Sequence, residues 1–149
     1  MSVTDNKKTI LSMIEHAQKK YTQSKLSGGN CGTFALALAR ELADRKISGV
    51  TLGILFKDEN GESETPKQIL DMETDVYHVV LEYANDRYDG TGKTTNTKLL
   101  QLAKRQYKDD KPSFVTDVKF DDKHLKRLIE NDTNWSIDSS KFQSCFKEI

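Results

Sequence analysis

The residue in this chain best placed to do chemistry is Cys31. It follows the segment Gly28–Asn30 and opens the most apolar run of the sequence, which continues to Ala43. This order predicts a loop that ends after a glycine pair, and then a buried helix that begins at the cysteine. Backbone N–H groups without helical partners and the positive end of the helix dipole favour a thiolate at that position. Because the thiolate is the nucleophilic form of cysteine, we interpret Cys31 as a candidate nucleophile.

Covalent acyl transfer also needs a base that takes the proton of the nucleophile and a group that orients the base. His78 and Asp89 follow Cys31 along the chain, and we assign them these two roles. The backbone N–H of Cys31, helped by the side chain of Asn30 or Gln23, would form an oxyanion hole. The candidate site therefore combines a nucleophile, a base, an orienting carboxylate and donors for the developing negative charge.

The segment around His78 is rich in valine and tyrosine, which predicts a strand over Asp75–Tyr83. Its side chains alternate between two faces, one with Tyr77, Val79, Leu81 and Tyr83, the other with Val76, His78, Val80 and Glu82. A two-residue turn at Asn85 and Asp86 would place Asp89 opposite Glu82, on the same face as His78. Glu82 is four residues from His78, about 13 Å along the strand. A direct hydrogen bond between His78 and Asp89 then requires a bulge, a strong twist or another turn.

Three stretches of sequence carry these residues. They read Gly-Gly-Asn-Cys-Gly-Thr-Phe-Ala-Leu-Ala-Leu from Gly28, Tyr-His-Val-Val-Leu-Glu-Tyr from Tyr77, and Arg-Tyr-Asp-Gly-Thr-Gly from Arg87. Here the chain resembles the papain-like cysteine peptidase superfamily, in particular its transglutaminase-core and NlpC/P60-like branches. The resemblance spans Gly28–Gly92. The chain differs from papain in lacking a tryptophan after the cysteine, and from most transglutaminases in the shorter interval between histidine and aspartate.

The resemblance implies a papain-like core, in which a helix in the N-terminal half carries Cys31 and packs on a small antiparallel sheet carrying His78. It implies Cys31 as nucleophile, His78 as base and Asp89 as orienting residue of a Cys-His-Asp triad. The implied reaction is hydrolysis, deamidation or acyl transfer at an amide or related acyl bond. It proceeds through an acyl-thioester, takes a protein or peptide-like substrate and needs no cofactor.

Two other interpretations remain open. A lone cysteine in an apolar helix is often only a small core residue, because free cysteine is among the most buried residue types. We interpret Cys145, on the apolar face of the last expected helix, in that way. Alternatively, the chain is a catalytically inactive papain-like binding module, for example a toxin-neutralising partner. Its contact surface would then be the acidic segment 58–75, which the sequence otherwise presents as a solvated loop.

Hydrophobic periodicity places the remaining elements. Helices are expected over Thr4–Tyr21, Cys31–Asp44, Thr95–Tyr107 and Ser139–Lys147, with another after a cap at Asp121, and strands over Val50–Phe56, Asp75–Tyr83, Arg87–Asp89 and Phe114–Phe120. Ser24–Asn30 is expected to be a polar break. Helices at both ends and strands in the middle predict an α+β fold with an antiparallel sheet and C-terminal helices. The length of 149 residues predicts one domain over residues 1–149.

The composition of the chain bears on its expected binding partners and cellular compartment. The 23 basic and 23 acidic side chains balance, which argues against a nucleic-acid partner. The longest apolar run, Phe34–Ala39, is too short to cross a bilayer, so no membrane association is expected. With 2 cysteines and no signal-peptide pattern at the start, we expect the cytoplasm, or export without a cleaved signal peptide. The sequence does not indicate an oligomeric state.

Two further sequence patterns, a glycine-rich stretch and the spacing of the histidines, do not indicate a binding site. The stretch Asp89–Thr95 resembles the end of a phosphate-binding loop, but the position where that motif needs its first glycine holds Arg87. Residues 90–93 are expected to form a turn instead. The three histidines, His16, His78 and His124, have no ligand-type spacing with cysteines or carboxylates, so no metal is expected.

Overall fold

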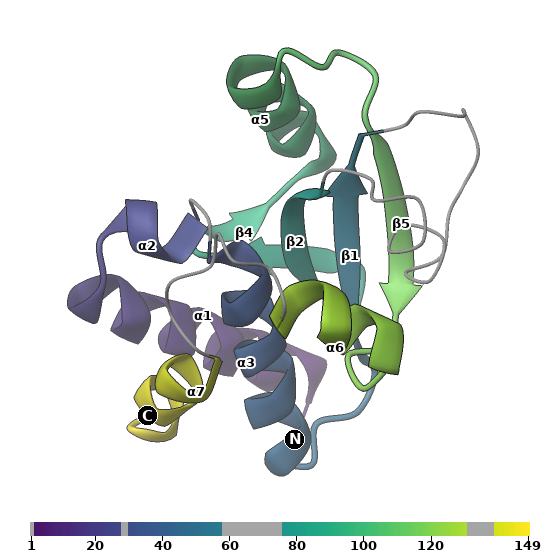
Figure 1. Cartoon of the computed structure of the whole chain (residues 1–149). Helices are drawn as coiled ribbons and strands as arrows, with labels where there is room; N and C mark the ends of the chain where they lie inside the picture. The colour runs from purple at the N-terminus through teal and green to yellow at the C-terminus, as the bar shows by residue number, and fades with distance from the viewer. Residues whose placement is uncertain (1, 28–29, 58–75, 131–138) are drawn as a thin grey trace.

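The computed structural model describes residues 2–27, 30–57, 76–130 and 139–149, and it is built around a five-stranded antiparallel sheet (Figure 1). The strand order is β4-β3-β2-β1-β5. The strands are β1 (Val50–Phe56), β2 (Val76–Tyr83), β3 (Asp86–Asp89), β4 (Gly92–Thr94) and β5 (Ser113–Val118). The helices are α1 (Val3–Lys20), α2 (Gln23–Ser27), α3 (Cys31–Asp44), α5 (Asn96–Tyr107), α6 (Lys123–Glu130) and α7 (Ser139–Lys147). This arrangement confirms the predicted α+β class with an antiparallel sheet.

Helices cover both faces of the sheet. One core cluster joins alternate residues of β1 and β2, among them Ile54 and Val79, to α1, α3 and α7. A smaller cluster joins the intervening Leu55 and Val80 to Leu99 of α5. Because successive strand residues point to opposite faces, α3 and α5 lie on opposite sides of the sheet. The helix that begins at Cys31 packs on β2 and β1, as expected from the sequence.

The helix α3 is buried on nearly every side. It is covered by the sheet on one side and by α7, which also contacts α1 (Figure 1). Phe34 of α3 makes edge-to-face contacts with two rings of α7, at centroid distances of 5.3 Å to Phe142 and 5.5 Å to Phe146. Such pairs add stabilisation beyond the area that they bury. The C-terminal helix α7 therefore holds the helix that starts at Cys31.

Most predicted boundaries agree with the structure, and the differences lie at ends and breaks. The helix α1 is capped by Ser2, which accepts from the N–H of Asp5, and not by Thr4 or Asp5. The helix α6 is preceded by Asp122, which accepts from the N–H groups of His124 and Leu125, and not by Asp121. The polar break contains the short helix α2, and residues 92–94 pair with β3 as the strand β4.

The turn between β2 and β3 differs from the prediction by one position. Ala84 and Asn85 form it, both with positive φ, 47° and 69°, as in the two-residue hairpin turns that match sheet twist. Tyr83 therefore pairs with Asp86, and Leu81 with Tyr88. Continued by one residue, this register brings Asp89 level with Val80 and not with Glu82. The predicted four-residue offset from His78 is thus reduced to two.

The strand β2 also contains a β-bulge. Leu55 of β1 pairs with His78, but Phe56 pairs with Val76, so Tyr77 is an extra residue. The predicted alternation is consequently wrong at this end of the strand. Tyr77 joins the cluster with Val80 under α5, whereas Val76 packs against the main core.

The acidic segment 58–75, expected as an exposed excursion, lies outside the described residues. Within the described ranges, no helix combines the length and apolar character needed to span a membrane. In the same ranges, no group of three or more His, Cys, Asp or Glu side chains could hold a metal ion.

Candidate active site

Cys31 is the first residue of α3 and is 6% exposed. Its predecessor Asn30 occupies the N-cap position and accepts, through its carbonyl, the N–H of Phe34 and the hydroxyl of Thr33. The sulfur therefore lies at the end of the helix where N–H groups lack helical acceptors. The apolar composition of α3 explains this placement, because burial of its remaining turns against the sheet and α7 holds the cysteine in place.

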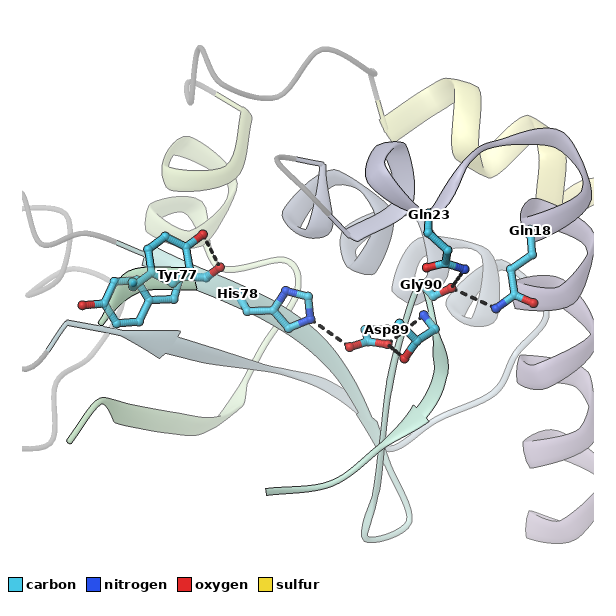
Figure 2. Close-up of polar contacts among 8 residues, drawn as sticks. Gln18, Gln23, Tyr77, His78, Asp89 and Gly90 are labelled. Carbon is cyan, nitrogen blue, oxygen red and sulfur yellow. Dashed lines mark hydrogen bonds and ion pairs between the residues drawn. The ribbon is translucent and has the colours of Figure 1, made fainter. Parts of the chain in front are cut away.

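His78 and Asp89 form a buried pair, and His78 is 1% and Asp89 5% exposed. Nε2 of His78 lies 2.9 Å from Oδ2 of Asp89 (Figure 2). The strand β2 holds the histidine, and the last residue of β3 is the aspartate. The structure thus brings together two of the predicted site residues that the expected register kept apart.

Cys31 also affects the pKa of His78. Burial in the protein opposes the charged imidazolium, but the Cys31 thiolate and the Asp89 carboxylate outweigh it and raise the pKa of His78 to about 10. An opposite charge nearby stabilises the charged form of a group. Cys31 therefore lies near enough to His78 to act on the charge of its imidazole.

The two ring nitrogens of His78 have different surroundings. Nε2 is engaged by Asp89, whereas Nδ1 has no hydrogen-bond partner among the described residues although it is buried. A buried polar atom without a partner is uncommon and calls for an explanation. Since Asp89 occupies Nε2, Nδ1 is the ring nitrogen left to interact with Cys31.

Asp89 is held from its other side by Thr91. Both the N–H and the hydroxyl of Thr91 donate to Oδ1 of Asp89. Burial alone would raise the pKa of Asp89, but the hydrogen bonds from His78 and Thr91 outweigh it and lower that pKa. Asp89 is therefore an anion with a fixed orientation, as an orienting carboxylate requires.

The predicted oxyanion-hole residue Gln23 lies beside this pair. Nε2 of Gln23 donates to the carbonyl of Gly90 at 3.1 Å, and Nε2 of Gln18 donates to the same oxygen at 2.9 Å (Figure 2). Asn30, the other predicted residue, is next to Cys31 and 3% exposed. Gln18 was missed by sequence reasoning. It follows the buried stripe of α1, and nothing local distinguishes it from other surface glutamines.

Cys145 is a core residue, as predicted. It is 3% exposed and belongs to the main hydrophobic cluster. Burial raises the pKa of its thiol. The chain therefore offers an internal control for Cys31, a second buried cysteine with no histidine assigned to it.

A separate cleft of about 630 Å³ lies at the hairpin end of β2. Its charged side chains bind one another. Glu82 accepts from Arg87, Thr116 and the N–H of Asp117, and Asp86 pairs with Lys93. Glu82 is thus committed to this cleft and takes no part in orienting His78.

No protein-family model, curated protein or solved structure matches this chain.

Proposed function

We propose that this protein is a thiol-dependent enzyme that acts on an amide or related acyl bond through an acyl-thioester on Cys31. The observation that supports this best is the buried imidazole of His78, which is hydrogen-bonded to the Asp89 carboxylate through Nε2 and has Cys31 among the groups that raise its pKa. Perturbed titration caused by specific charged partners is characteristic of functional sites. The papain-like resemblance of Gly28–Gly92 agrees with this assignment.

The residues suggest a two-stage reaction. The Cys31 thiolate attacks the acyl carbon, and the carbonyl electron pair moves to oxygen, where the N–H of Cys31 is the proposed donor. When the tetrahedral intermediate collapses, the bond to the leaving group breaks and His78 gives it the proton from Nδ1. Asp89 keeps the imidazole oriented and stabilises its positive charge. An acyl-thioester on Cys31 results.

In the second stage, neutral His78 takes a proton from an incoming water or amine, which attacks the thioester and releases Cys31 as thiolate. Hydrolysis and deamidation use water, and acyl transfer uses an amine. The intermediate is common to all three, so the proposal extends to a protein or peptide-like acyl substrate and leaves the second nucleophile open.

The acyl-thioester can be tested with a simple activated ester. Incubation with p-nitrophenyl acetate should release a burst of p-nitrophenolate and leave one acetyl group on Cys31, identified by mass spectrometry of peptides. Cys145→Ala should retain the burst, and Cys31→Ala should lose it. Acetylation of both cysteines at equal, slow rates would contradict the proposal. That result would favour the inactive binding module, whose expected contact segment 58–75 lies outside the described residues.

A further inference from the structure

The bulge in β2 involves Tyr77, the residue directly before His78. Leu55 of β1 pairs with His78 and Phe56 pairs with Val76, so Tyr77 has no partner position on β1 in the regular hydrogen-bond ladder. Bulges are found next to active sites, where they re-aim a side chain. The polar backbone groups that a bulge frees need other partners, because unpaired buried groups are costly. The orientation of His78 therefore depends on what holds Tyr77.

The C-terminal end of α5 supplies that support. The hydroxyl of Tyr107 donates to the carbonyl of Tyr77 at 3.3 Å, and the two rings stack with centroids 4.2 Å apart and planes at 16°. The hydroxyl of Tyr77 donates in turn to Oδ2 of Asp109 at 2.9 Å. Both the backbone and the side chain of Tyr77 are thus bound by one short segment.

That segment is itself well held. Lys108 ends α5 in the left-handed conformation, with φ of 56°, and the N–H of Asp109 donates to the carbonyl of Ala103. Oδ1 of Asp109 accepts from the N–H of Lys111, which leaves Oδ2 directed at Tyr77. This helix ending returns the chain toward β2 and presents Asp109 and Tyr107 together.

Tyr107 contributes less to the core than its size allows, because it is 44% exposed. Two of its contacts, a hydrogen bond and a ring stack, are with Tyr77. In Figure 2, Tyr77 lies on the side of His78 away from Asp89. The histidine is therefore flanked by Asp89 on one side and by the supported bulge on the other.

We propose that Tyr107 and Asp109 are positioning residues, which hold the bulge at Tyr77 and thereby keep the His78 imidazole aligned with Cys31 and Asp89. The inference rests on the proposed function, because it concerns the base of that reaction. It assigns a role to α5, which lies on the opposite face of the sheet from the helix that carries Cys31.

The test uses Tyr107→Phe, which removes the hydroxyl and keeps the ring, together with Asp109→Ala. Leu100→Ala is the matched control, because Leu100 lies on the same helix and is 50% exposed. The measurements are the rate of Cys31 alkylation by iodoacetamide, the titration of the His78 ring nitrogens by NMR, and the thermal midpoint.

A misplacement of about 1 Å can cost up to about 10²-fold in rate, so we expect Tyr107→Phe and Asp109→Ala to slow alkylation roughly tenfold. Both should also lower the pH at which His78 titrates, while the thermal midpoint of Tyr107→Phe stays close to that of the wild type. If Cys31 is alkylated at the wild-type rate and His78 titrates at the wild-type pH in both variants, the inference is wrong. An unreactive Cys31 in the wild type would overturn the proposed function instead, and the His78 titration would still decide whether Tyr107 positions the ring.

Discussion

Nε2 of His78 and Oδ2 of Asp89 lie 2.9 Å apart because the hairpin between their strands turns at Ala84 and Asn85. A turn one residue later would return Asp89 to the level of Glu82, about 13 Å from His78 along the strand. The position of the turn at the far end of the hairpin thus determines whether the carboxylate reaches the imidazole.

The turn has an unfavourable residue. Ala84 has a φ of 47°, a left-handed conformation that costs a residue with a Cβ atom roughly 1 kcal/mol and that glycine adopts freely. We expect Ala84→Gly to raise the free energy of unfolding by about 0.5 kcal/mol, after the greater chain entropy of the unfolded glycine variant is subtracted. Urea denaturation measures this change. A loss of stability would mean that the turn is not formed as described.

The two cysteines should differ in reactivity. At neutral pH, iodoacetamide should modify Cys31 before Cys145, since Cys31 interacts electrostatically with His78 while burial raises the pKa of Cys145. General-base assistance typically contributes at least about 10²-fold, so His78→Ala should slow the labelling of Cys31 by tenfold or more. Labelling of Cys145 in the same sample is the control. Equal rates at both cysteines would leave Cys31 a structural residue.

Asp89 and Glu82 should respond differently to loss of charge. Asp89→Asn keeps an oxygen that accepts from His78 but removes the anion, so it should slow acetylation of Cys31 less than His78→Ala does. Glu82→Gln should leave the acetylation rate unchanged, because Glu82 binds Arg87 and Thr116 in the separate cleft at the hairpin end of β2. A damaging Glu82→Gln with a harmless Asp89→Asn would transfer the orienting role to Glu82.

The aromatic contacts between α3 and α7 should matter for stability. Phe142 is fully buried and contacts Phe34 and Tyr21 edge to face. Truncation of a buried phenylalanine costs about 3–5 kcal/mol, so Phe142→Ala should lower the free energy of unfolding by that amount. Ile149→Ala is the control on the same C-terminal segment, since Ile149 is 48% exposed. Similar small losses in both variants would mean that α7 does not support α3.

Sequence patterns predicted the elements well where burial dictates the pattern. The bounds Cys31–Asp44, Val50–Phe56 and Ser139–Lys147 agree with α3, β1 and α7 because apolar residues recur there with the period of the element. The predicted position of the turn was wrong by one residue. Alanine is not a typical turn residue, yet Ala84 adopts the left-handed conformation, while Asp86, a residue type more common in turns, begins β3.

The residue types of the candidate site could be recognised in the sequence, but their geometry could not. Cys31, His78 and Asp89 could be chosen from the sequence, since nucleophile, base and carboxylate are recognisable chemistries. Gln18, Tyr107 and Asp109 could not, because their partners are backbone or side chains distant in sequence, such as Gly90 and Tyr77. The bulge that adds Tyr77 has no local signature of its own. It becomes visible only when β1 and β2 are paired.

The charge on His78 gives the most direct test of the site. An unperturbed histidine loses its proton near pH 6.5, whereas the combined effect of Cys31 and Asp89 raises the pKa of His78 to about 10 in spite of burial. A raised pKa means that the proton is retained as the pH rises, so the NMR signals of the His78 ring nitrogens should stay those of an imidazolium from pH 6 to pH 8. The spectrum of His78→Ala identifies which signals belong to His78.

Removal of either anion should shift this titration in a known direction. Cys31→Ala and Asp89→Asn each take away a negative charge that stabilises the imidazolium, while the opposing effect of burial remains. Both variants should therefore deprotonate at a lower pH than the wild type, and the double variant at a pH lower than either. Cys145→Ala should leave the titration unchanged. A wild-type His78 that loses its proton near pH 6.5, with no shift in Cys31→Ala, would show that the sulfur and the imidazole do not share a proton.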